Sequence, residues 1–352
     1  MSANQVYRDR VEKLLRTYAK DADHIYDDIL KGFSGTLTRA AVVALRCHID
    51  VDFVETDATF RISSTQKNAP WGLERISNKL RGKKTYCYDE SAGAGTCSYI
   101  LDSGIDASHP QFGDRARQLV SFIPGQRRDG LGHGTFCAGL VGGWYFGVAK
   151  KTRLYGVKIL SNRGRGYVSA LVAGLNFVAR DHKSRSCGKG VVVNISMGGP
   201  RSVAENRAVA ALVRRGIFVS VAAGNSRTFA SLVSPASARS ACTVGAFNRL
   251  DTFASFSNFG RAIDVSAPGV NIWSAWPGRK MKLGSGTSAS AAYVTGLAAY
   301  LAAKEGIKGS QLCGRIKQLS LKNKLKRVPR GTVNRMAFNK PLNQYYYCYP
   351  YG

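Results

Sequence analysis

Short apolar runs and amphipathic stretches alternate along the central part of the chain. Four runs rich in aliphatic and aromatic residues predict buried strands, at 98–101, 154–159, 191–195 and 217–221. Between the last three of these, apolar residues at helical spacing predict helices over 168–179 and 203–214. Because strands that alternate with helices form βαβ units, the pattern predicts an α/β fold with a mostly parallel sheet flanked by helices.

The N-terminal segment has a different pattern. Val11, Leu14, Leu15 and Tyr18 lie at helical spacing and predict an amphipathic helix. Three further elements are predicted: a strand and turn over 25–33, a helix over 39–45 and a strand over 51–56. A boundary is expected near 58–70, where the polar segment SSTQKN lies. We therefore expect a small α+β domain over residues 1–63 and a larger domain over 64–352.

Positive charge is concentrated in the larger domain. The whole chain has a formal net charge of +29. Residues 1–63 contain 9 Lys or Arg and 10 Asp or Glu, whereas residues 64–352 contain 42 and 12. A solvated basic surface that keeps the protein soluble is one interpretation. Adsorption to polyanions or to an anionic solid is the other.

Several classes of protein find little support in the sequence. There is no zinc-finger spacing and no RNA-binding aromatic motif, which argues against specific nucleic-acid recognition. No stretch approaches 18 apolar residues, so no transmembrane helix is expected. The first twenty residues lack the apolar region of a signal peptide.

Three polar residues lie where the chain turns out of predicted regular structure. Asp102 ends a strand in YILDSGID, His133 lies in GLGHGTFCAG, and Ser288 lies in GSGTSAS before a long apolar helix. Taken singly, such residues are usually structural, the serine as a helix N-cap. In open α/β sheets, however, chemistry gathers at the carboxyl ends of the strands. Their combination, with these Gly-rich flanks, favours a common catalytic role.

The same flanks resemble the three active-site motifs of the subtilisin-like serine proteases. These motifs are DSGI, HGT with CAG behind it, and GTS at a helix start. Longer segments, among them TQKNAPWGLERIS, YGVAKKTRLYGVKIL and SFSNFG, are similar to the proteinase K branch of fungal enzymes. This resemblance runs from about residue 66 to Phe338, and residues 24–57 resemble the family's inhibitor propeptide. It implies a subtilisin-like endopeptidase made as a zymogen, with residues 1–63 as a propeptide incomplete at its N-terminal end.

The resemblance implies a role for each candidate catalytic residue. Ser288 would attack the scissile carbonyl, His133 would take its proton and pass it to the leaving amine, and Asp102 would fix the histidine tautomer. Asn225, in VAAGNS, matches the oxyanion-hole asparagine of the family and would act with the Ser288 backbone N–H. This chemistry requires no cofactor.

Substrate is expected to bind as an added β-strand. The matching edges are Gly164, Arg165 and Gly166 on one side and Ser196, Met197, Gly198 and Gly199 on the other. The wall of the first specificity pocket matches Ala222, Ala223 and Gly224. Small walls imply a roomy apolar pocket and broad specificity, with an apolar preference at the residue before the cut. Glycines at these positions would also suit ordinary turns.

Five positions depart from the usual family pattern. Val168 stands where the family has the tyrosine that walls the outer subsite, and Tyr167 comes one position early. Ala289 replaces the methionine after the serine, Ala292 replaces a proline, and Tyr293 replaces a histidine. Phe136 replaces the histidine that usually follows HGT. None of these changes removes a catalytic group, and they leave the catalytic rate and the subsite preference open.

The chain contains eight cysteines, without CxxC or zinc-site spacing. By themselves, they fit either long-range disulfides or buried thiols in a reducing compartment. The resemblance pairs Cys97 with Cys187 and Cys242 with Cys313, and it leaves Cys137 free beneath the active-site histidine. Cys87 and Cys348 are left to join the two ends of the mature chain, and Cys47 lies in the propeptide.

A structural calcium ion is a further implication of the resemblance. Asp264 aligns with a calcium-ligand aspartate, with backbone carbonyls near Arg239 and Ala241 as its partners. Arg239 stands where the family has a proline. A surface aspartate paired with nearby arginines is the alternative interpretation.

The expected partners are protein substrates and the chain's own propeptide as inhibitor, with an anionic surface or cell-wall polymer as a further one. By family resemblance we expect an extracellular monomer that binds neither a membrane nor a specific nucleic acid. The alternative hypothesis is a catalytically weak homologue that uses its basic surface to bind polyanions.

Overall fold

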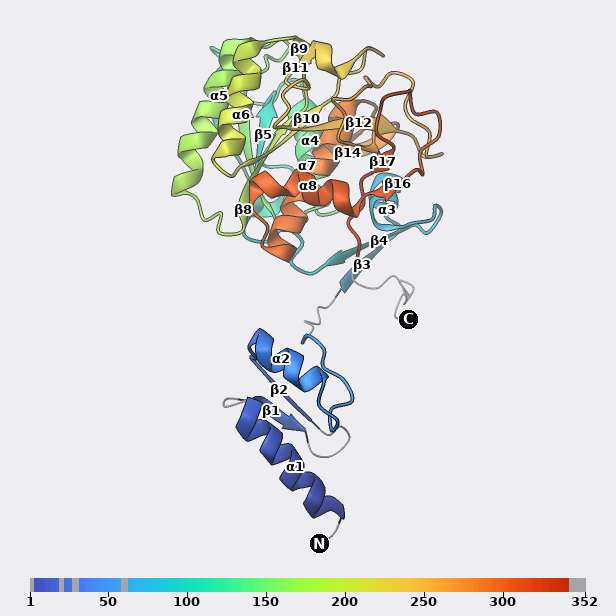
Figure 1. Cartoon of the computed structure of the whole chain (residues 1–352). Coiled ribbons are helices and arrows are strands. Elements are labelled where there is room, and N and C mark those ends of the chain that lie inside the picture. The colour runs from blue at the N-terminus through green and yellow to red at the C-terminus, as the bar shows by residue number, and fades with distance from the viewer. Residues whose placement is uncertain (1–2, 19–21, 27–31, 58–62, 342–352) are drawn as a thin grey trace. The chain divides into compact units, whose positions relative to one another are not determined.

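The chain forms two compact units, Met1–Phe60 and Arg61–Gly352 (Figure 1). The computed structural model describes residues 3–18, 22–26, 32–57 and 63–341. Each unit is described by itself below.

The first unit is a small α+β arrangement. Its helices are α1 (Ala3–Tyr18) and α2 (Arg39–Arg46), and its strands β1 (Ala22–Tyr26) and β2 (Gly32–Gly35) pair antiparallel. The hydroxyl of Thr38 caps α2 by accepting a hydrogen bond from the Ala41 backbone N–H at 3.2 Å.

One predicted strand of this unit, over 51–56, is wrong. The backbone there is irregular, and Phe53 is 59% exposed. An alternating pattern forms a strand only where a partner strand takes up its backbone hydrogen bonds, and β1 and β2 pair with each other. Of the strand and turn predicted over 25–33, residues 27–31 lie outside the described part of the chain.

The second unit is built on a nine-stranded sheet, in the order β16-β17-β13-β12-β10-β8-β5-β7-β6. All neighbouring pairs from β17 to β6 are parallel, and β16 pairs antiparallel with β17. The strands are β5 (Thr96–Asp102), β6 (Ala116–Ser121), β7 (Arg153–Lys158), β8 (Gly190–Ile195), β10 (Phe218–Ala222), β12 (Cys242–Phe247), β13 (Val265–Pro268), β16 (Leu321–Lys322) and β17 (Arg335–Met336).

Helices cover both faces of this sheet, as the apolar pattern predicts (Figure 1). One face packs on α4 (His133–Gly142), α7 (Thr287–Glu305) and α8 (Gly309–Leu319), and the other on α5 (Val168–Asp181) and α6 (Val203–Arg214). Nearly every residue of α7 is buried, which suits its small and apolar sequence.

Shorter elements complete the second unit. They are α3 (Trp71–Ser77) and the strand pairs β3 (Ser63–Lys67) with β4 (Thr85–Asp89), β9 (Gly199–Pro200) with β11 (Val233–Ser234), and β14 (Ile272–Trp276) with β15 (Lys280–Gly284). Three short 3₁₀ turns lie at Gly113–Arg115, His182–Ser184 and Ala230–Leu232.

Two disulfides have both cysteines within the described residues of the second unit. Cys97 is joined to Cys187 and Cys242 to Cys313, with Cα–Cα distances of 5.4 and 5.6 Å. These are the two pairs that the family resemblance implies. The predicted link from Cys87 to Cys348 involves a residue outside the described part of the chain. Cys137 is buried and Cys47 is exposed, both as free thiols.

The strand order reverses at β5, which has β7 on one side and β8 on the other. Such a reversal opens a crevice at the carboxyl ends of the strands, where ligands of α/β proteins bind. Asp102 is the last residue of β5, so the candidate catalytic residues gather at this point. Within the described residues, no helix is long and apolar enough to cross a membrane.

Candidate active site

Asp102, the last residue of β5, is hydrogen-bonded to the partly exposed side chain of His133. The Nδ1 atom of His133 lies 2.8 Å from Oδ1 and 2.9 Å from Oδ2 of Asp102. The aspartate is fully buried, and its Oδ1 also accepts the Ser103 backbone N–H at 2.7 Å. Burial by itself lowers the pKa of His133, but the Asp102 carboxylate outweighs this and raises it well above its usual range.

A second buried carboxylate, which the sequence reasoning missed, holds His133 in place. Asp129 accepts the backbone N–H groups of Gly132 and Thr135, at 2.7 and 2.9 Å, in the first turn of α4. It also accepts the Ser103 hydroxyl at 2.8 Å, and that hydroxyl accepts the Gly134 N–H at 2.9 Å. A carboxylate at a helix N-terminus satisfies unpaired N–H groups and opposes the positive end of the helix dipole. The one sequence feature that could have indicated this role of Asp129 is its position just before the HGT motif.

Ser288 lies in the first turn of α7, and two hydrogen bonds tie it to the end of β8. Its hydroxyl donates to the carbonyl oxygen of Ser196 at 2.8 Å. The Ser196 hydroxyl donates in turn to the Ser288 carbonyl oxygen at 3.0 Å. Ser196, predicted on the substrate edge, is therefore also a direct neighbour of the candidate nucleophile.

The carboxamide of Asn225 is oriented by Thr287. Its Oδ1 accepts both the backbone N–H and the hydroxyl of Thr287, each at 2.8 Å. The hydroxyl of Thr287 also accepts the Gly224 N–H at 3.1 Å. With the oxygen held in this way, the Nδ2 donor of Asn225 is directed away from these bonds. Thr287 belongs to the GTS motif, but the sequence reasoning gave it no role.

The predicted substrate edges follow the two strands that flank β5. After β7, two backbone hydrogen bonds close a tight turn. The Gly164 N–H donates to the Ser161 carbonyl at 2.9 Å, and the Ser161 N–H donates to the Arg165 carbonyl at 2.8 Å. Gly164 has a φ of +76°, a conformation that favours glycine. After β8, Met197 is half-buried and Gly198 is exposed, while Gly199 already pairs with Ser234 of β11.

The predicted pocket wall after β10 depends on Asn258, another residue that the sequence reasoning missed. Ala222 and Ala223 are buried, and Gly224 has a φ of +101°. The buried Asn258 side chain donates to the Ala223 carbonyl at 2.8 Å and accepts the N–H groups of Ser226 and Thr228. A Cβ at residue 224 would lie 2.3 Å from this side chain, so glycine is required there. Asn258 lies in the quoted SFSNFG segment, which was the only available signal.

Four of the five departures from the family pattern are buried, and the fifth, Val168, is exposed. Ala289 and Ala292 are 2% and 0% exposed within α7. Tyr293 is fully buried, and a Cβ at Gly72 would clash with its hydroxyl. Phe136 lies against Gly284 of β15. These four residues therefore affect packing within α4 and α7, the helices that carry His133 and Ser288.

The arrangement around Asp264 differs from what a calcium ion would need. Its Oδ1 lies 3.0 Å from the ammonium of Lys317, and its Oδ2 accepts the Thr243 N–H at 3.0 Å. Calcium requires several oxygen ligands free to face the ion, and both oxygens of this carboxylate face donors. Of the two carbonyl candidates, Arg239 is exposed and Ala241 is buried. The residues present do not fit calcium while Lys317 holds this position.

Comparison with known proteins gives one consistent answer. Residues 93–337 match the subtilase family. The chain is 50% identical to a cuticle-degrading protease of Metarhizium anisopliae, over 90% of this chain and 83% of that protein. It is 47% identical to proteinase R of Parengyodontium album, over 90% and 82%. It is 50% identical to proteinase T of the same organism, over 82% and 98%.

A solved structure agrees with these sequences. The crystal structure of a cold adapted subtilisin-like serine proteinase superposes with a TM-score of 0.73 and 37% identity, covering 79% of this chain and all of that one. Because the family match spans most of the second unit and the relatives span most of the chain, this protein belongs to the subtilase family and is a subtilisin-like serine endopeptidase.

Proposed function

We propose that Asp102, His133 and Ser288 are the catalytic triad of this endopeptidase. The observation that carries the proposal is the buried Asp102 carboxylate, with both oxygens within 2.9 Å of His133 Nδ1. This contact fixes the tautomer in which Nε2 can accept a proton, and it stabilises the imidazolium that forms. Asp129 supports this by holding the first turn of α4.

Ser288 must release one hydrogen bond before it reacts. Its hydroxyl donates to the Ser196 carbonyl, so rotation about χ1 toward Nε2 of His133 precedes attack on the scissile carbon. Catalytic hydrogen bonds often form only when substrate is bound. The serine oxygen then bonds to the carbonyl carbon while its proton passes to His133. His133 returns this proton to the leaving amine, and water releases the acyl group by the reverse route.

Asn225 and the Ser288 backbone N–H would stabilise the oxyanion. Thr287 occupies the carboxamide oxygen of Asn225, so the NH₂ group is the part available to the developing charge. A preorganised donor of this kind stabilises the transition state by roughly 3–4 kcal/mol.

Substrate would add a strand between the two edges, at Gly164–Gly166 and Ser196–Gly199. The small residues Ala222, Ala223 and Gly224 leave room for apolar side chains, which implies broad specificity at the residue before the cut. We further propose an extracellular enzyme that acts as a monomer and whose residues 1–63 inhibit it until they are cleaved off.

A fluorophosphonate probe tests the mechanism, because it labels only an activated serine. The wild-type protein should be labelled, and Ser288→Ala should not be. The Ser288→Ala precursor should also stay at full length, whereas the mature wild-type protein should begin between about Ile62 and Asn68. Ser290→Ala is the matched control, since Ser290 is a buried structural serine two residues away. Labelling of Ser288→Ala would overturn the assignment. Unlabelled wild-type protein that binds polyanions would favour the catalytically weak homologue.

A further inference from the structure

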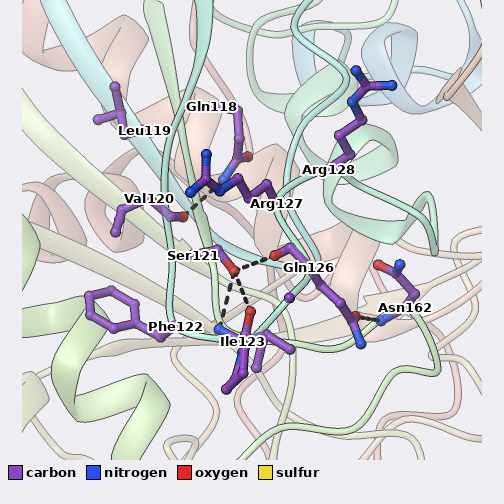
Figure 2. A pocket seen from close by; sticks show the side chains of 12 residues that line it. Gln118, Leu119, Val120, Ser121, Phe122, Ile123, Gln126, Arg127, Arg128 and Asn162 are labelled. Atoms are coloured by element: carbon purple, nitrogen blue, oxygen red, sulfur yellow. Dashed lines mark hydrogen bonds between the residues drawn. The ribbon is translucent and has the colours of Figure 1, made fainter.

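A large hollow lies beside the predicted substrate edge (Figure 2). It has a volume of about 1170 Å³ and is formed by β6, by the loop at 122–128 and by Asn162. β6 is the last strand of the nine-stranded sheet, so among the described residues it pairs with β7 alone. The mechanism proposed above does not use this hollow.

Asn162 connects the hollow to the predicted substrate edge along the chain. The backbone N–H of Asn162 donates to Gln126 Oε1 at 2.7 Å (Figure 2). The side-chain oxygen of Asn162 accepts the Gly130 N–H at 3.2 Å. Gly164 of the substrate edge follows Asn162 by two residues, and the loop at 122–128 runs on to His133. The side chain of Asn162 is held from beneath by the buried ammonium of Lys158, at 2.9 Å.

The charge of the hollow is positive and unbalanced. Arg127 and Arg128 line it and are exposed, and its other lining residues include no Asp or Glu. In the described part of the chain, neither guanidinium has an ion pair or a hydrogen-bond partner. Figure 2 shows the Arg127 side chain extending toward Gln118 and Val120 of β6.

Asp129, the nearest acidic residue in sequence, does not neutralise these arginines. Its two oxygens accept hydrogen bonds from the α4 turn and from Ser103, and it is 7% exposed. On the neighbouring turn, Arg163 and Arg165 are exposed and likewise without an ion pair among the described residues. Two adjacent loops therefore present four cationic side chains next to the path proposed for the substrate.

We propose that this hollow, the anion subsite, binds carboxylate side chains of substrate residues upstream of the scissile bond. The proposal rests on the proposed function, since the substrate strand at Gly164–Gly166 brings those residues past Asn162. An extended strand advances about 3.3 Å per residue, so acidic residues within about four positions of the cut come within reach of an arginine side chain. Guanidinium groups bind carboxylates with two parallel hydrogen bonds, which makes an acidic peptide the matching ligand.

The test measures peptide binding separately from cleavage. Two peptides of one sequence are compared, one with two Asp or Glu upstream of the cut and one with Asn or Gln there. Fluorescence anisotropy gives the Kd of each for mature protein in which Ser288 has been blocked with a small fluorophosphonate, and kcat/KM is measured on the active enzyme. Arg127→Gln/Arg128→Gln removes the anion subsite. Arg214→Gln/Arg330→Gln is the matched control, because it removes the same charge at exposed positions elsewhere.

We expect the acidic peptide to bind about 5–20-fold more tightly than the neutral one at low salt, as two partly exposed charge pairs allow. This ratio should fall below about 2 in Arg127→Gln/Arg128→Gln, remain in the control, and decrease as salt screens the charges. The kcat/KM ratio should follow the Kd ratio.

Three results would overturn the proposal: no acidic preference in the wild type, an equal preference in Arg127→Gln/Arg128→Gln, or an equal loss in the charge-matched control. If the hollow binds an anionic polysaccharide instead, Arg127→Gln/Arg128→Gln should be retained more weakly on that polymer than the wild type. The Kd ratio of the two peptides should then be the same in both proteins. Absent cleavage would count against the proposed function alone, since the Kd ratio is measured without it.

Discussion

At the scale of single residues, Asn225 shows how its neighbours decide what a side chain can do. A carboxamide offers both an acceptor and a donor, and only the donor is useful beside an oxyanion. Thr287 occupies the acceptor with two bonds of 2.8 Å, one from its backbone and one from its hydroxyl. The orientation of Asn225 therefore depends on the residue next to the proposed nucleophile, Ser288.

Asn225→Ala should lower kcat by roughly 10²–10³-fold with little change in KM, because the lost donor acts on the oxyanion and not on the ground state. Thr287→Val should cost less, about tenfold, since the backbone N–H still holds the Asn225 oxygen. Steady-state kinetics on one peptide measures both. A rise in KM with unchanged kcat in Asn225→Ala would place this residue in substrate binding only.

The pH dependence of activity should follow His133. Its pKa is raised well above the usual value because the Asp102 carboxylate favours the imidazolium. Only the neutral imidazole can take the serine proton, so activity should rise with pH through a midpoint above about 6.5. Asp102→Asn removes the charge, so the midpoint should move down and kcat should fall by about 10⁴-fold. A midpoint at or below the usual histidine value in wild-type enzyme would contradict this account.

At the scale of elements, a disulfide and a salt bridge, both from one face of α8, connect this helix to the sheet. Cys313 and Lys317 are four residues apart, so both point to the same side of the helix. Cys313 is bonded to Cys242 of β12, and Lys317 pairs with Asp264 just before β13. The Lys317 ammonium thus supplies the positive charge that a bound cation would supply beside the Asp264 carboxylate.

Chelation should therefore change the stability of the wild type little. Lys317→Gln should lower Tm by at most about 4 °C, since this pair is partly exposed and 1 kcal/mol corresponds to about 2–4 °C in a domain of this size. Excess calcium should then raise the Tm of Lys317→Gln more than that of the wild type, because Asp264 is left unpaired. Lys324→Gln, at an exposed site nearby, is the control. A large loss of wild-type Tm in chelator would mean that calcium displaces Lys317.

At the scale of the whole molecule, the net charge is distributed unevenly between the N-terminal segment and the rest of the chain. The segment 1–63 is nearly neutral, while residues 64–352 carry an excess of 30 positive charges. Much of this charge is exposed, which suits adsorption to an anionic solid or cell-wall polymer.

The mature enzyme should bind an anionic matrix at low salt and be released as the ionic strength rises, because the Debye length shrinks from about 10 Å at 0.1 M salt to about 3 Å at 1 M. Ser288→Ala should be retained equally, since adsorption needs no catalysis. Retention that does not change with salt, or that is equal on a neutral matrix, would show that charge is not the cause.

The sequence by itself determined the class of fold and the identity of the candidate catalytic residues. The periodicities at 154–159, 168–179 and 203–214 became β7, α5 and α6 with small shifts at their ends. Burial of one face or two imposes these patterns locally, so they can be read without a structure. The DSGI, HGT and GTS motifs each contain one residue of the proposed triad, so the candidates could be identified from short contiguous segments.

Only the tertiary structure decided which distant groups meet. Lys317 and Asp264 are 53 residues apart, and the Ser196–Ser288 contact spans 92. Asp129 and Asn258 were missed for the same reason, since each acts through partners that the folded chain brings to it. The irregular backbone at 51–57 and the gathering of Arg127 and Arg128 at the hollow also depend on the tertiary structure. Local pattern fixes how a segment folds, but pairing and charge balance depend on what the rest of the chain places beside it.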